Sequence, residues 1–229
     1  MKRLIFILCM LAPLVTSAQS DWFVPSKVGT QLRYAVYNQD GSITSYMTTI
    51  TDSVTLTADS TWIVHQRSTL YNARNQPTGA VLYSESRISN DTTYLAINRI
   101  SNNSGARVRT WGTLVALPPT ITPSTTFANQ SLDCTVRYAG MTFNATTNIN
   151  DISLMNYETL TVDNHIYNTI KLSYNTSTRV LGRNEQSFVT TWIAKQVGIM
   201  LVVVDNQQSG ESTTTKLIGI SEGSGSTDQ

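Results

Sequence analysis

Apolar and polar side chains alternate along many short segments of this 229-residue chain, and this period of two limits the fold more than any other feature. Within 132–138 the even positions are apolar and the odd positions are polar, and the same alternation runs from Ile170 to Asn175. Successive side chains of a strand point to opposite faces, so each segment predicts a strand with one buried face. Cys134 is expected on such a buried face.

The first strand is predicted after Gly29, where Leu32, Tyr34 and Val36 alternate with polar or small residues. A longer strand follows over 45–56. Its alternation predicts an apolar face in the core and a polar face in water. The apolar face carries Tyr46, Ile50, Val54 and Leu56, and the polar face carries Ser45, Thr49, Ser53 and Thr55.

Turn signals such as Asp40-Gly41, Asn90-Asp91 and Asp163-Asn164 separate these segments at short intervals. Short strands joined in this way are typical of antiparallel hairpins and meanders. Helical spacing with a capping residue is missing, and the nearest candidate, 151–157, would form one turn. The fold class is therefore predicted as all-β, an antiparallel meander with little or no helix. The sheet must protect its edges by curling into a barrel or a two-sheet sandwich, and both remain open.

The composition supports strands and argues against a highly charged partner. Only 14% of residues are charged, and Lys plus Arg (16) nearly balance Asp plus Glu (15). Low charge with abundant Thr, Val, Ile and Tyr is typical of β-proteins. Since the charges are scattered, neither nucleic acid nor an anionic membrane surface is predicted as a partner. A monomer is expected.

The N-terminus has the order of a secretory signal peptide: Lys2 and Arg3, the apolar run Leu4–Val15, then small residues ending at Ala18. We predict a signal peptide over 1–18, cleaved after Ala18; a buried first strand is the alternative. A membrane span needs roughly 20 apolar residues, and this run has 12. Bulky Leu8 before Cys9 argues against a lipid-modified cysteine. The protein is therefore expected to be exported, to the periplasm or the cell surface, with no membrane span.

The remaining chain, 19–221, is predicted to form a single all-β domain, followed by a disordered tail over 222–229. An alternative is suggested by the proline-rich segment 118–131, which could join two half-barrels, 22–117 and 132–221. A similar fragment occurs in each half, Thr55–Ser60 and Thr159–Asn164. Chance similarity in a Thr-rich chain is the competing explanation.

The sequence offers few groups for catalysis. Its two histidines, His65 and His165, belong to no local motif, and Cys134 has no neighbouring histidine or glycine-rich elbow. Phosphate loops and metal-ligand spacings are missing as well. We therefore predict no catalytic, cofactor-binding or metal-binding residues. An enzyme remains the third hypothesis, and it would need the dispersed carboxylates Asp52, Glu85, Glu158 or Glu185.

Aromatic residues are spread over nearly every predicted strand, and a curled sheet would gather some of them on its concave face. The first functional hypothesis is a non-catalytic protein that binds an unidentified small apolar or amphipathic molecule there. The alternative is that these aromatic side chains pack in the core and contact no ligand. The second hypothesis is an envelope structural or interaction protein that uses an exposed strand edge or a Ser/Thr-rich face. The candidate ligand-lining residues are Tyr34, Tyr46, Trp62, Tyr174 and Trp192.

Two regions resemble the TapB-like family of exported proteins of Bacteroides-type bacteria, whose function is unknown. They are Trp22–Pro25 with Gly29 and Leu32–Tyr34, and the C-terminal run Thr191–Ile199. The segment Asn164–Tyr167 departs from the family pattern because it lacks a glycine. The resemblance implies a curved antiparallel β-fold in the periplasm or at the cell surface, with no established reaction. Three segments also look like O-glycosylation acceptors of that group: Asp52–Val54, Asp59–Thr61 and Asp91–Thr93.

Overall fold

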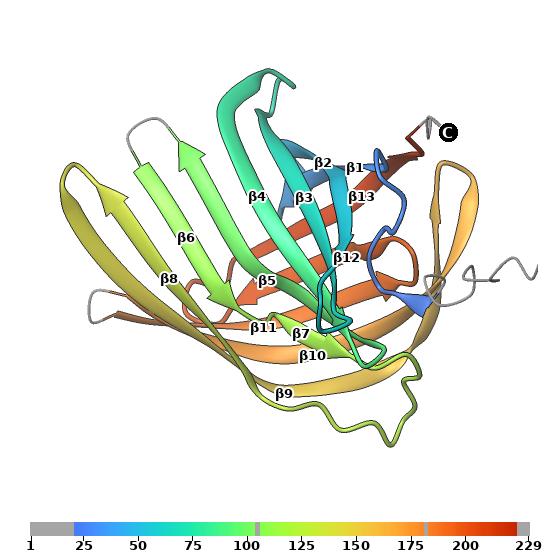
Figure 1. Ribbon diagram of the computed structural model, residues 1–229. Coiled ribbons are helices and arrows are strands. Elements are labelled where there is room, and N and C mark those ends of the chain that lie inside the picture. The colour runs from blue at the N-terminus through green and yellow to red at the C-terminus, as the bar shows by residue number, and fades with distance from the viewer. Residues whose placement is uncertain (1–20, 104–105, 181–182, 224–229) are drawn as a thin grey trace, which may run out of the picture.

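The computed structural model describes residues 21–103, 106–180 and 183–223, which Figure 1 draws in colour. The predicted signal peptide lies outside these residues, as does most of the predicted tail. The described part of the chain is almost entirely antiparallel strand, which confirms the predicted fold class. None of its helical segments is long and apolar enough to cross a membrane.

Thirteen strands follow one another along the chain. They are β1 (Gln31–Asn38), β2 (Ile43–Leu56), β3 (Trp62–Asn72), β4 (Pro77–Ser89), β5 (Thr92–Asn103), β6 (Ala106–Gly112), β7 (Val115–Leu117), β8 (Gln130–Tyr138), β9 (Met141–Val162), β10 (His165–Val180), β11 (Arg183–Ala194), β12 (Gly198–Asn206) and β13 (Ser212–Ser221).

All thirteen strands belong to one sheet, in the order β4-β3-β2-β1-β13-β12-β11-β10-β9-β8-β6-β5-β7. A further pairing joins β4 to β5, so the order returns on itself. The short β6 and β7 follow each other along the same edge of β5. Figure 1 shows the result as a strongly curled sheet, in which β3, β4 and β5 rise above β9, β10 and β11. The structure is therefore one curled sheet, a half-barrel, and the two-sheet sandwich is not formed.

The main core lies inside this curl, where Val64, Ile149 and Leu172 have no exposed surface. Ile170 and Tyr174, on the same face as Leu172, are also buried, which confirms the apolar face predicted there, whereas Ser173, predicted on the polar face, is buried as well. A second, smaller cluster gathers around Leu32, Tyr34 and Leu217. Burial of this apolar surface is the main force that holds the sheet in its curled form.

The N-terminal segment runs into the core before the first strand begins. Trp22 and Phe23 are each 3% exposed, and the Trp22 ring centroid lies 5.5 Å from that of Trp62. The backbone N–H of Gln196, in the turn between β11 and β12, donates a 2.7 Å hydrogen bond to the Trp22 carbonyl. The two regions that carry the family resemblance therefore pack against each other, although they lie far apart in the sequence.

Segment 151–157, the nearest candidate for a helical turn, is strand within β9, so that expectation is wrong. The regular alternation is lost there because the β9–β10 pairing shifts register twice, between Lys171 and Leu172 and between Ser173 and Asn175. Asp151 takes a positive φ of 58° at this irregularity, and its carboxylate accepts a hydrogen bond from the Asn175 side chain. An inserted residue of this kind is a β-bulge, which disturbs the period of two.

The faces predicted for β2 are reversed in its first half. Thr49 and Thr51 are buried, whereas Tyr46 and Ile50 are only half-buried. The β2–β3 register shifts between Thr51 and Ser53, and a shift of one residue moves every following side chain to the other face. The interior accepts hydroxyl groups because they pair across strands, as Thr49 Oγ1 does with Ser68 Oγ at 2.7 Å. Cys134, predicted to be buried, is half-buried.

One buried hydroxyl lacks such a partner, and it provides a test of this interior. Thr51 Oγ1 is buried without a hydrogen bond to any described residue. Thr51→Val keeps the shape and removes the unpaired oxygen, so we expect it to raise the free energy of unfolding by about 1 kcal/mol. Thr49→Val removes the bonded hydroxyl and should instead destabilise. Urea unfolding of both variants checks this, and a loss for Thr51→Val as large as that for Thr49→Val would contradict it.

Candidate functional site

A cavity of about 960 Å³ lies between the ends of β9, β10 and β11, the N-terminal segment and the loop 118–129. We call it the large cavity. Its lining combines apolar side chains with a few polar ones. The lining residues are Phe23, Pro119, Thr120, Ile121, Tyr157, Glu158, Thr159, Asn168, Thr169, Ile170, Ile193 and Lys195.

Strand pairing explains how three strands form the floor of the large cavity. Tyr157 of β9 is paired with Ile170 of β10, which is paired in turn with Ile193 of β11. Paired residues point to the same face of a sheet, so these side chains form one row. Thr159 and Asn168 form the next pair on that face.

The loop 118–129 forms the opposite side of the large cavity. Its prolines cannot donate to a ladder, so the chain leaves the sheet after β7 and rejoins it at β8. The Tyr157 hydroxyl donates a 2.6 Å hydrogen bond to the Ile121 carbonyl, and the Ile121 side chain is buried in the main core. The loop is therefore fixed to β9 across the cavity.

The N-terminal segment contributes Phe23, whose backbone N–H donates to Thr93 Oγ1 at 3.3 Å. Lys195 lies beside it at the exposed rim, with Nζ 6.0 Å from the centre of the Phe23 ring. Its amine forms an ion pair with Asp21 at 2.5 Å. The rim of the large cavity therefore has hydrogen-bonding groups but little net charge.

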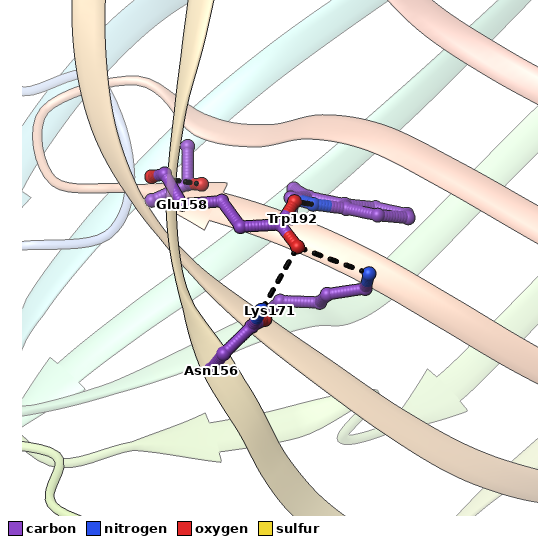
Figure 2. Close-up of polar contacts among 5 residues, drawn as sticks. Asn156, Glu158, Lys171 and Trp192 are labelled. Atoms are coloured by element: carbon purple, nitrogen blue, oxygen red, sulfur yellow. Dashed lines mark hydrogen bonds and ion pairs between the residues drawn. The ribbon is translucent and has the colours of Figure 1, made fainter.

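Glu158 contributes to the lining, but its carboxylate lies among side chains of the opposite face. Figure 2 shows it between Trp192, Lys171 and Asn156. It accepts hydrogen bonds from Trp192 Nε1 at 2.6 Å, Asn156 Nδ2 at 3.0 Å and Lys171 Nζ at 3.1 Å. The Lys171 amine also lies 4.6 Å from the centre of the Trp192 ring. We call these four residues the Glu158 cluster.

The Glu158 cluster favours the ionised carboxylate, since all three partners donate to it. The hydrogen bond from Trp192, followed by those from Asn156 and Lys171, lowers the pKa of Glu158 below its ordinary value of 4.5. A carboxylate with a lowered folded pKa stabilises the protein above its unfolded pKa, and this contribution is lost as the pH falls through the folded pKa.

A pH series tests the Glu158 cluster. Below pH 4.5, the melting temperature of the wild-type protein should fall more steeply than that of Glu158→Gln, which cannot titrate. Glu185→Gln is the matched control. It removes the same charge from an exposed carboxylate of β11. Parallel curves for wild type and Glu158→Gln, measured by circular dichroism between pH 3 and 7, would contradict the prediction.

A second, smaller cavity of about 250 Å³ lies within the curl, between β1–β5 and β12–β13. Apolar residues such as Leu82 and Leu95 line it together with a group of hydroxyl and amide side chains. The polar group comprises Thr49, Gln66, Ser68, Ser84, Ser86 and Thr215. This cavity is thus more polar than the alternating sequence pattern suggested.

The five predicted ligand-lining aromatics are not brought together. Of the five, Tyr34 borders the small cavity, where burial raises its pKa and its hydroxyl donates to the Ile199 carbonyl at 2.9 Å, and the other four line neither this cavity nor the large one. Trp62 and Tyr174 pack in the main core, Trp192 belongs to the Glu158 cluster, and Tyr46 lies under Arg33. Their contact with a ligand stays a prediction.

The other residues considered for chemistry have local partners. His65 lies 3.4 Å from Glu85, and His165 Nδ1 lies 2.9 Å from the Asp163 carbonyl. Asp52 pairs with Arg67. Within residues 21–103, 106–180 and 183–223, no three His, Cys, Asp or Glu side chains are grouped so that they could hold a metal ion. Glu158 is the only carboxylate residue that lines the large cavity.

The fold and the large cavity together define a curled all-β protein with a space of ligand size. The chain belongs to the DUF3108-like family, which matches residues 27–209. The narrower TapB-like name stays a prediction. No curated protein matches the sequence.

Two solved structures share the fold. One is a Bacteroides fragilis protein assigned as exported and described as having a YmcC-like fold, with a TM-score of 0.68 and 16% identity. It matches 87% of this chain over 99% of its own length. The other is a Parabacteroides distasonis protein assigned as a lipoprotein, with a TM-score of 0.67 and 13% identity over 87% of this chain and 98% of its own. At such identities the likeness concerns the fold.

Proposed function

We propose that this protein is an exported, non-catalytic binding protein that holds an apolar or amphipathic molecule in the large cavity. The observation that carries the proposal is the cavity itself, whose 960 Å³ fall within the range of about 300–1,000 Å³ typical of small-molecule sites. Much of its lining is apolar, including Phe23, Ile121, Ile170 and Ile193. When an apolar ligand displaces water from such a surface, the free energy of the system falls, which favours binding.

The rim of the large cavity restricts which polar groups the ligand can carry at its exposed end. Thr120, Thr159 and Asn168 offer hydrogen bonds there, and Asp21 neutralises Lys195. An uncharged polar end, such as a hydroxyl, ester or amide group, suits this rim better than a strongly charged one, because it would not compete with the ion pair.

Export is supported by the N-terminal pattern of Lys2, Arg3 and the apolar run Leu4–Val15. The two proteins of similar fold, assigned as exported and as a lipoprotein, agree with it. The resemblance to the TapB-like family also points to the periplasm or the cell surface. A non-catalytic role is supported by the pairing of Asp52, Glu85 and Glu158 with cationic or histidine side chains.

The test uses an uncharged apolar fluorophore, N-phenyl-1-naphthylamine, with the full-length secreted protein. We expect saturable binding at one site in the wild type. Asn168→Trp places a large ring at the rim and should weaken binding at least about tenfold, which corresponds to roughly 1.4 kcal/mol. Asn148→Trp is the matched control, because Asn148 is an equally exposed β9 position that borders neither cavity. Equal affinities in the two variants, or no saturable binding, would reject the proposal.

A further inference from the structure

The outer face of β6 and β8 carries a concentration of positive charge. These strands lie side by side, and their register places Arg107 directly opposite Arg137. Arg109 follows two residues after Arg107 on the same face, and all three side chains are exposed. Trp111 continues this face, 39% exposed, with the Arg109 guanidinium 5.9 Å from the centre of its ring. We call these four residues the arginine face.

The charge of the arginine face is only partly balanced by the protein, because three arginines stand against one carboxylate, Asp133. Like charges directly opposite each other destabilise a strand pair. None of the three arginines forms an ion pair with an acidic residue of the described chain, whereas Lys27, Arg67, Lys171 and Lys195 all do. Asp133 lies opposite Trp111, and its carboxylate accepts a hydrogen bond from Thr146. An anion bound from outside would relieve the repulsion between Arg107 and Arg137.

The arginine face continues across neighbouring strands. One row of paired positions runs from Arg67 of β3 through Tyr83 of β4 and Ile100 of β5 to Arg109 of β6. Tyr83 is 47% exposed, so a second aromatic ring lies about two strand spacings, roughly 9.6 Å, from the position of Arg109. Neither the large nor the small cavity includes Arg67, Tyr83, Arg109 or Trp111. The surface is thus open and extended, which suits a polymer that lies across the strands.

We propose that the arginine face binds an acidic polysaccharide. Arginine presents a planar set of donors that matches carboxylate and sulfate groups, and the Trp111 and Tyr83 rings offer flat apolar surfaces against which sugar rings can pack. A polymer that repeats both features contacts the row of arginines and aromatic rings at several points at once, which raises its avidity. This binding is independent of the large cavity.

Calorimetric titration of the full-length protein with polygalacturonate and with heparin tests the proposal. We expect both to bind, with affinity that falls as salt rises from 50 to 500 mM, and neutral dextran not to bind. The double variant Arg107→Gln/Arg137→Gln should lose at least about tenfold in affinity without loss of thermal stability, because it removes a repulsive pair. Trp111→Ala should weaken binding while leaving its salt dependence unchanged.

The matched control is Arg33→Gln/Arg74→Gln, which removes the same charge from exposed positions outside the arginine face. Arg33, like Arg109, lies over an aromatic ring, here that of Tyr46. It should change the affinity less than about twofold. Equal losses in the two double variants would show attraction by net charge alone and overturn the proposal. Tighter binding to phosphatidylglycerol vesicles or to oligothymidine than to either glycan would overturn it too, as would the absence of glycan binding.

Discussion

Gly112→Ala should lower the free energy of unfolding by at least about 3 kcal/mol, because two costs add at this position. Gly112 ends β6 with a φ of +119°, which L side chains rarely adopt. An added Cβ would lie 2.1 Å from the Ser131 carbonyl oxygen and 3.1 Å from Leu132 Cα. Both contacts are with the backbone of β8, so relief requires moving the strand.

Gly41→Ala is the control that separates these costs. Gly41 has a similar positive φ of +81°, but an added Cβ there meets no atom within 4 Å. Its substitution should therefore cost only the backbone strain, about 1 kcal/mol. Both variants can be compared by urea unfolding. Equal losses would show that β6 and β8 do not approach as closely as described.

Leu172→Ala should lower the free energy of unfolding by about 3–5 kcal/mol. Leu172 lies in the middle of β10, has no exposed surface and belongs to the main core. Its neighbours in the sheet are Leu154 of β9 and Thr191 of β11, so the lost side chain leaves a cavity that two flanking strands hold open. Thermal and urea unfolding both measure the loss.

Leu56→Ala is the matched control for Leu172→Ala, because Leu56 ends β2 with 56% of its surface exposed. This substitution should change stability by no more than about 0.5 kcal/mol. A loss for Leu172→Ala that did not exceed the loss for Leu56→Ala would contradict the placement of Leu172 in the core.

The strands and many of their buried faces could be predicted because alternation is a local property. Ile170, Leu172 and Tyr174 alternate with polar residues in the sequence, and the structure buries all three. Alternation does not predict the faces of a strand beyond a bulge, because an inserted residue reverses them. The extra residue Asp52, between Thr51 and Ser53, reverses the faces of β2, and a single Asp within a strand-like run does not by itself identify an insertion.

The candidate site was less predictable than the fold. The large cavity is formed by aliphatic residues such as Ile121 and Ile193, which in isolation cannot be distinguished from ordinary core residues. Phe23 and Tyr157 were visible as aromatics, yet nothing local indicated that the loop after β7 would lie across them. Of the five predicted ligand-lining aromatics, Tyr34 therefore borders the small cavity and none borders the large one.

A strand-rich, antiparallel fold and the lack of a recognisable catalytic motif could be inferred from the amino-acid order, because side-chain period and residue type are properties of the chain. Three-dimensional packing was needed to establish that the strands form one curled sheet, that Tyr157 meets Ile121 over a cavity, and that Arg107 faces Arg137. These contacts join residues from different strands and loops, so they depend on register and on curvature. Both are set by long-range packing, which a local pattern does not contain.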